Sequence, residues 1–231
     1  MRGRLAKLLL GFVLAMPPSM PLRCHGTDRL PKASGEGTFE QHGNATRFHV
    51  ELSEMKPASL FGGDFNTYVV WAVASPSEAE NIGECVLVGS HCSVEGSAKR
   101  PAVSMFVTAE PHFLVSTPSR FVVLEPQSTA SPQYEGHRLT YNYERDSLAE
   151  AKEAKGVVEN NLRQAVTAVR LARRAGAAEL APLEFQAARQ RLQALLSSRS
   201  KEPHALETES RETVRLAVAA QQIAAERARQ Q

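Results

Sequence analysis

The sequence predicts an α+β protein with the two classes in separate domains, an antiparallel β-sandwich and then a three-helix antiparallel Ala-rich bundle. Val, Phe and Tyr, with the single Trp, dominate the middle of the chain, whereas Ala, Arg, Gln and Glu dominate after about Asp146. The first set favours strands and the second favours helices. The β-prone runs are short and separated by Gly and Pro, which is typical of a sandwich or a barrel. The 231 residues suffice for two small domains, each with its own core.

Residues 1–26 are expected to form an export signal peptide. Residues 1–7 carry three basic side chains and no acid, residues 8–16 are an apolar run, and the prolines at 17–18 break any helix. This order is typical of a secretory signal, and the run is about half as long as a bilayer-spanning helix. We place the cleavage between Ser19 and Gly26 and expect no transmembrane span in the mature chain. The alternative interpretation is a buried N-terminal helix.

The β-sandwich domain is expected over residues 38–126, after a flexible tether at 27–37 that contains Gly, Ser and Pro. Residues 46–52 alternate polar and apolar side chains, as a half-buried strand does. Residues 67–73 form a denser apolar run, which predicts a central strand. Further strands are expected at 84–88, 92–94, 102–108 and 121–124.

Tyr68 and Trp71 lie in the densest of these runs, so we interpret them as core residues. The alternative is a sugar-binding platform, because aromatic rings stack on apolar faces.

The three cysteines are Cys24, Cys85 and Cys92. Between Cys85 and Cys92, the pair Gly89-Ser90 is typical of a turn, and a hairpin there would bring the two thiols within reach of a disulfide. An oxidising periplasm permits such a bridge; the alternative is two buried thiols. Cys24 is a candidate for lipidation at the end of the signal, although Arg23 fits a lipoprotein signal poorly. One Cys pair with a neighbouring His does not predict a metal site, since zinc usually takes four ligands at recurring spacings.

Residues 127–145 are polar, contain Pro and Gly, and are expected to be a linker that lets the two halves move. The helical bundle follows at 146–231. Ser147 and Glu150 form a capping box, Gly176 is placed to end the first helix in a left-handed conformation, and Pro182 suits the first turn of the next.

Apolar residues recur at helical spacing in each of the three expected helices, but most of them are Ala. Alanine buries little area, so one such helix gains only a few kcal/mol at ~25 cal/mol/Å². The stripes must therefore face one another or another chain, and three helices with short connections most simply form an antiparallel bundle. Arg170, Arg173 and Arg174 cluster near a helix C-terminus, which indicates a solvated basic face or, alternatively, a contact with phosphate or anionic lipid.

Three segments of the middle region resemble a β-domain of exported bacterial proteins. They are FNTYVVWAV at 65–73, NIGE at 81–84 and VTAEPHF at 107–113. The pattern is similar to that of the Ig-like sandwich in the extracytoplasmic part of some anti-sigma factors. The resemblance covers about 38–126 and implies a fold rather than an activity, because it brings no catalytic residue with it.

The segment 168–189 is similar to domain-of-unknown-function family 4398, whose pattern of Ala, Gly, Pro and Glu it shares around Gly176, Pro182 and Glu184. The likeness covers about 160–229. That Ala-rich helical module occurs in bacterial envelope proteins, often lipoproteins or chains with an OmpA-like peptidoglycan-binding domain. The resemblance implies a place in the cell envelope and leaves peptidoglycan contact open.

The function classes that the sequence favours are non-enzymatic. The histidines are scattered, and no nucleotide-binding, metalloprotease or hydrolase motif is present. A net charge of +2 does not provide the basic surplus that nucleic-acid binding needs. No cofactor is expected.

The expected function is therefore that of an exported periplasmic or envelope protein with a structural or protein-interaction role, and an association with the outer membrane is left open. Its partner would be an envelope protein or a second copy, bound through the helical half. The alternative is a regulatory module whose sandwich senses a glycan or a small molecule.

Overall fold

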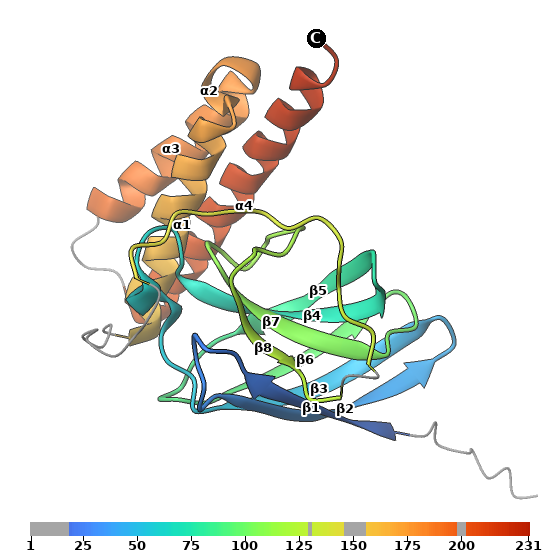
Figure 1. Ribbon diagram of the computed structural model, residues 1–231. Helices are drawn as coiled ribbons and strands as arrows, with labels where there is room; N and C mark the ends of the chain where they lie inside the picture. Colours follow the sequence, from blue (N-terminus) through green and yellow to red (C-terminus); the bar gives the residue numbers. More distant parts are fainter. Residues whose placement is uncertain (1–18, 129–130, 146–155, 198–201) are drawn as a thin grey trace, which may run out of the picture.

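The computed structural model describes residues 19–128, 131–145, 156–197 and 202–231. Within these ranges the protein is α+β, an antiparallel sheet of eight strands followed by C-terminal helices (Figure 1). A short 3-10 helix, η1 (Ala58–Phe61), lies between the third and fourth strands. The strands are β1 (Ser19–Gly26), β2 (Ser34–His42), β3 (Ala45–Ser53), β4 (Thr67–Ser75), β5 (Glu78–Cys85), β6 (Cys92–Ala98), β7 (Ser104–Glu110) and β8 (Val122–Pro126).

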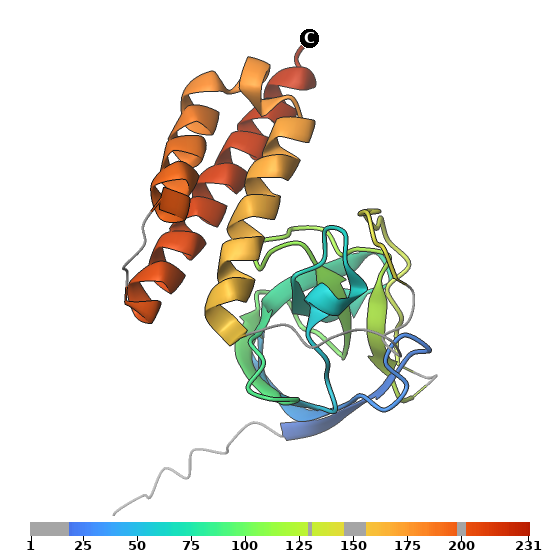
Figure 2. The same cartoon turned by 90° about the vertical axis from the view of Figure 1, so that its left-hand side faces the viewer.

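The strands form one sheet in the order β5-β4-β7-β8-β1-β2-β3-β6 rather than the two facing sheets of the expected sandwich. This sheet curls round so that β5 and β6 approach each other, and the result is a nearly closed barrel (Figure 2). Gly96 in β6 explains how close the two strands come, because a Cβ there would lie 2.0 Å from the Ile82 carbonyl oxygen. Curling removes most of the free edge that an open sheet would expose.

The barrel interior is filled by large side chains such as Phe48, Leu52 and Tyr68, all essentially inaccessible to solvent. Strand β4 is buried on both faces, as its dense apolar run predicted. Tyr68 faces the interior, whereas Trp71 packs outside the barrel wall against Phe106 and Val115. Neither aromatic ring is accessible, so the structure does not support a sugar-binding platform on them.

The first described strand lies in the region that the sequence analysis assigned to the end of the signal. Residues 19–26 form β1, which pairs with β2 along its length and with β8 at its C-terminal end. Residues 34–37 of the expected tether belong to β2. Cleavage between Ser19 and Gly26 and lipidation at Cys24 stay predictions; cleavage within this range, or loss of the residues before Cys24, would remove residues that pair in β1.

The linker prediction also differs from the structure. Residues 131–145 run along the barrel and are bound to it at several points, as where the Glu144 and Arg145 amides donate to the Phe61 carbonyl oxygen. Tyr134 stacks on Phe106 with ring centroids 5.7 Å apart. Polar residues and a proline predicted mobility, but Tyr134 here packs on the outside of β4 and β7, and the residues after it are hydrogen-bonded to Pro118 and Phe61.

The helices are α1 (Gly156–Arg174), the short α2 (Ala177–Leu180), α3 (Pro182–Ser197) and α4 (Pro203–Ala228). Gly176 has φ of 78° and ends α1 in the left-handed conformation that was predicted, and Pro182 is the first residue of α3. Ser147 and Glu150 lie outside the described residues, so their capping box is not described. No helix of the described ranges is long and apolar enough to span a bilayer.

The Ala faces of the helices pack on one another around Phe185, which is buried among Ala residues of α1, α3 and α4. Phe113 and Leu114 of the β-domain pack against the same cluster. The helices therefore stand on one side of the barrel, with α1 nearest to it (Figures 1 and 2).

Candidate functional site

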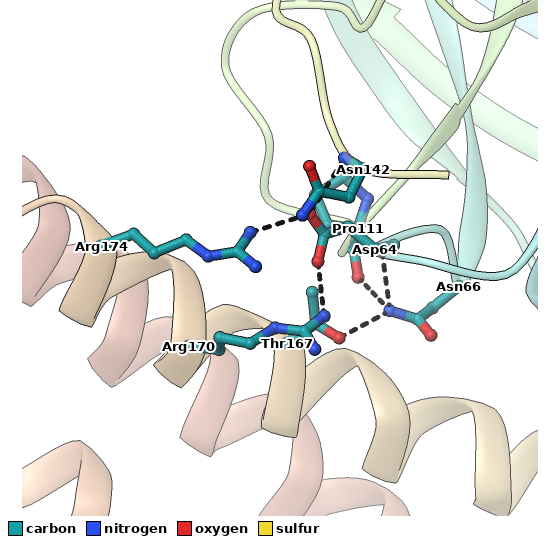
Figure 3. A network of polar contacts seen from close by, with 7 residues as sticks. All are labelled: Asp64, Asn66, Pro111, Asn142, Thr167, Arg170 and Arg174. Carbon is teal, nitrogen blue, oxygen red and sulfur yellow. Dashed lines mark hydrogen bonds and ion pairs between the residues drawn. The ribbon is translucent and has the colours of Figure 1, made fainter. Parts of the chain in front are cut away.

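The junction between the barrel and the helices is centred on the buried acid Asp64, which lies just before β4 (Figure 3). Its side chain is only 2% exposed and forms ion pairs with Arg170 and Arg174 of α1. Asn142 donates its backbone N–H to the same carboxylate, at 3.2 Å. A buried carboxylate is tolerated only when such partners compensate the loss of water.

Asn66 extends this network to α1. Its side-chain amide donates to the Thr167 hydroxyl at 3.1 Å and to the carbonyl oxygens of Asp64 and Pro111. Asn66 thus links the barrel backbone directly to a helical side chain that follows it by 101 positions.

A second buried acid, Glu84 at the end of β5, holds the helices from another strand. Its side chain is 5% exposed and forms an ion pair of 2.7 Å with Arg211 of α4. Gln164 of α1 donates to its other oxygen at 2.7 Å, and Thr67 donates there at 2.8 Å. The Arg211 guanidinium lies 3.9 Å from the Phe113 ring centroid, within range of a cation–π contact. These contacts fix two helices against the barrel, which makes free movement of two separate domains unfavourable.

A third buried acid, Glu110, belongs to the barrel alone. It accepts hydrogen bonds from the Thr108 hydroxyl at 2.5 Å and the Ser119 amide at 2.7 Å, and Thr108 in turn accepts from the Trp71 indole. Its other oxygen has no hydrogen-bond partner in the described structure. Burial raises the pKa of Glu110 to about 8, against the opposing effect of these hydrogen bonds.

His112, two residues after Glu110, is also buried, and its Nδ1 has no hydrogen-bond partner among the described residues. Burial lowers the pKa of His112 to about 4. Glu110 and His112 have shifted pKa values, as catalytic groups often do, but neither lines the groove or the cavity described below. Within the described ranges, no three His, Cys, Asp or Glu residues are placed to hold a metal ion.

A groove of about 470 Å³ runs between α1 and α3 on the outer side of the helices. Its apolar lining includes Val166 and Leu196, which are 38% and 57% exposed. Arg173 and Arg189 flank it, and each guanidinium lies about 6 Å from the Phe185 ring. Neither arginine forms an ion pair with a residue that the structure describes, and no acid lines the groove. It is an exposed apolar surface whose positive border has no acidic partner among the described residues.

The structure places the three cysteines singled out from the sequence in different environments. Cys85 and Cys92 are joined in a disulfide with Cα atoms 5.5 Å apart, so the expectation that they lie within bridging distance is confirmed. The strands that they flank do not form a hairpin in the sheet; β5 and β6 lie at its two ends, and the turn at Gly89 is closed by an isolated bridge between Val88 and His91. Cys24 is a buried thiol whose hydrogen contacts the Met105 carbonyl oxygen.

The basic cluster on α1 is divided between two roles. Arg170 and Arg174 pair with Asp64, and Arg173 borders the groove. Asp64 was missed, because nothing near it in sequence distinguishes a junction from an ordinary polar loop. Asn66, Glu84 and Phe113, by contrast, stand in the segments that carry the resemblance.

The structure thus defines a chain in which a barrel-like sheet holds C-terminal helices through buried acids and presents an apolar, positively bordered groove. No family model, no curated protein and no solved structure matches the chain.

Proposed function

We propose that the protein is a non-enzymatic, exported protein of the bacterial cell envelope that binds another protein through its helices. In this proposal α1, α3 and α4 act as an antiparallel three-helix bundle, and the barrel is a rigid support that sets its orientation. The basic and apolar N-terminal pattern supports export. The Cys85–Cys92 disulfide supports an oxidising compartment such as the periplasm.

The observation that carries the proposal is the groove between α1 and α3. The sequence suggested docking because narrow Ala stripes bury little area, but these stripes are occupied in packing on one another. Val166 and Leu196 stay exposed in the groove, beside two arginines that form no ion pair with a described residue. An amphipathic helix laid in a groove buries apolar residues of this kind, and acids on its flank would compensate Arg173 and Arg189. We therefore infer an acidic amphipathic helix of an envelope protein as the occupant.

Capture of the partner from an envelope fraction tests this proposal with three variants of the full chain. Leu196→Glu and the double variant Arg173→Glu/Arg189→Glu should lose the captured protein. Leu183→Glu is the matched control, because Leu183 is also on α3 and 78% exposed but does not line the groove. A partner retained by both groove variants would contradict the proposal.

Self-association is the competing outcome for the same surface. Sedimentation of the purified full chain at micromolar concentration distinguishes it: a dimer abolished by Leu196→Glu would replace a foreign partner with a second copy. A monomer that also captures no protein dependent on the groove would exclude both.

A further inference from the structure

A cavity of about 670 Å³ lies where one end of the barrel meets the first turns of α1. Its walls come from residues 55–59, from the start of β4, from the loop 86–90 and from α1. Small-molecule sites commonly have volumes of about 300–1,000 Å³, so the cavity is of the size that one small ligand fills.

The lining contains polar residues, among them the buried Asn66 and Thr67, but its apolar surface is the larger. Met55, Ala58 and Tyr68 are buried there, and Leu87 lies partly buried beside the Cys85–Cys92 disulfide. The Tyr68 hydroxyl donates to the Lys56 carbonyl oxygen at 2.7 Å, so it is already used. These buried side chains offer a ligand apolar contact.

The walls are held in place before any ligand arrives. The Met55 amide donates to the Ser90 carbonyl oxygen at 2.9 Å, which joins the two loops that face each other across the cavity. The disulfide closes the base of the loop 86–91. A preformed cavity spares a ligand the entropy cost of ordering these loops.

The charged residues at the cavity are Lys56, Glu159 and Arg163. Glu159 and Arg163 neutralise each other through an ion pair of 2.9 Å on α1. Lys56 is exposed and forms no ion pair with a described residue, so among the described residues that line the cavity its positive charge has no acidic partner.

We propose that this cavity binds a single-chain amphiphile with one anionic head group, such as a medium-chain carboxylate. The chain lies against Met55, Tyr68 and Leu87, and the carboxylate pairs with the Lys56 ammonium. The site is distinct from the groove between α1 and α3, so it adds a small-molecule ligand to the proposed protein partner.

Calorimetric titration of the oxidised full chain with dodecanoate, below its micelle concentration, tests the proposal. We expect one molecule bound per chain, and weaker binding of dodecanol and of dodecyltrimethylammonium, which lack the negative charge. Lys56→Glu should weaken dodecanoate binding at least tenfold and leave dodecanol nearly unchanged. Lys32→Glu is the matched control, because it makes the same charge change at an exposed position away from the cavity.

Two further variants establish whether the ligand occupies this cavity. Ser59→Phe places a large side chain at the lining and should abolish binding of both dodecanoate and dodecanol, with the Trp71 and helical signals showing that the chain stays folded. Leu196→Glu, in the helical groove, should leave dodecanoate binding intact. Absence of dodecanoate binding, equal affinity in Lys56→Glu and Lys32→Glu, or loss of binding in Leu196→Glu would each overturn the proposal without affecting that of a protein partner.

Discussion

The barrel and the helices are built around cores of different kinds. The barrel interior holds large side chains such as Phe48 and Phe61, whereas most buried positions between the helices are Ala. Burying a large apolar side chain stabilises the fold by about 1.5–3 kcal/mol, and burying Ala stabilises it much less. The barrel can therefore be stable through its own core, while the helices depend on Phe185 and on the buried acids that tie them to the barrel.

Among the substitutions considered, Phe185→Ala should separate the stability of the helices from that of the barrel most strongly. It removes the largest side chain of the helical core, which we expect to cost about 3–5 kcal/mol. The single Trp71 reports on the barrel, and circular dichroism at 222 nm reports mainly on the helices. In urea, the helical signal of the variant should be lost at a lower concentration than the Trp fluorescence change.

Leu183→Ala is the control for this prediction, because Leu183 lies on the same helix and is 78% exposed. It should change the free energy of unfolding by less than about 0.5 kcal/mol. Coincident loss of both signals in Phe185→Ala would show instead that barrel and helices unfold as one unit.

At the Asp64 junction, removing the two arginines should cost more stability than removing the carboxylate. Arg170→Met with Arg174→Met leaves a carboxylate that is 2% exposed without a cation, which we expect to cost about 3 kcal/mol. Asp64→Asn leaves two arginines that are 44% and 47% exposed and can turn to water, so about 1 kcal/mol is expected. Urea unfolding of both variants measures the difference, and a larger loss in Asp64→Asn would refute a desolvated carboxylate as the sensitive partner.

Glu110 should make the barrel less stable as pH rises. Its pKa is raised by burial from the ordinary 4.5 to about 8, so between these values the folded chain holds a proton that the unfolded chain has lost. Stability then falls with increasing pH by up to about 1.4 kcal/mol per unit. A Gln at position 110 does not titrate. Between pH 5.5 and 7 the free energy of unfolding of the wild type should therefore fall by about 2 kcal/mol relative to that of Glu110→Gln.

His112 provides the opposite slope and serves as the control. Its pKa is lowered from 6.5 to about 4, so the unfolded chain binds a proton that the folded chain does not, and stability rises with pH across that window. His112→Gln should therefore remove the loss of stability that the wild type shows as pH falls below about 6.5, and it should leave the pH dependence of stability above pH 7 unchanged. Parallel pH profiles of Glu110→Gln and the wild type would rule out a protonated Glu110.

The sequence predicted those parts of the fold that have a local pattern. Strands β3, β4 and β7 lie where alternating or dense apolar runs predicted strands, because burial of one or both faces imposes that pattern. Gly176 was predicted at its left-handed position for a similarly local reason. Strand β2 was missed because its glycines weaken the β signal; at Gly37 a Cβ would lie 2.2 Å from the His49 carbonyl oxygen, so packing requires the glycine.

The candidate sites were much less predictable. Asp64 meets Arg170 and Arg174 across more than 100 residues, so the pairing depends on how the helices dock and leaves no local pattern. The sandwich prediction failed for a related reason. Short strands separated by turns suit a sandwich and a barrel alike, and the distinction depends on which strands pair at long range.

A small loss of stability is also expected from a substitution at the end of α1. Gly176→Ala should cost about 1 kcal/mol, because φ of 78° brings an L side chain close to its own carbonyl group, while the nearest other atom to an added Cβ, in Leu180, is 3.6 Å away. Strain is therefore the only expected cost, and Gly176→Asn, which tolerates this conformation better, should lose less. Thermal unfolding followed by circular dichroism compares the two. Equal losses would mean that the position is limited by space rather than by backbone conformation, and the sharp turn from α1 into α2 and α3 would then depend on packing of the Ala-rich core.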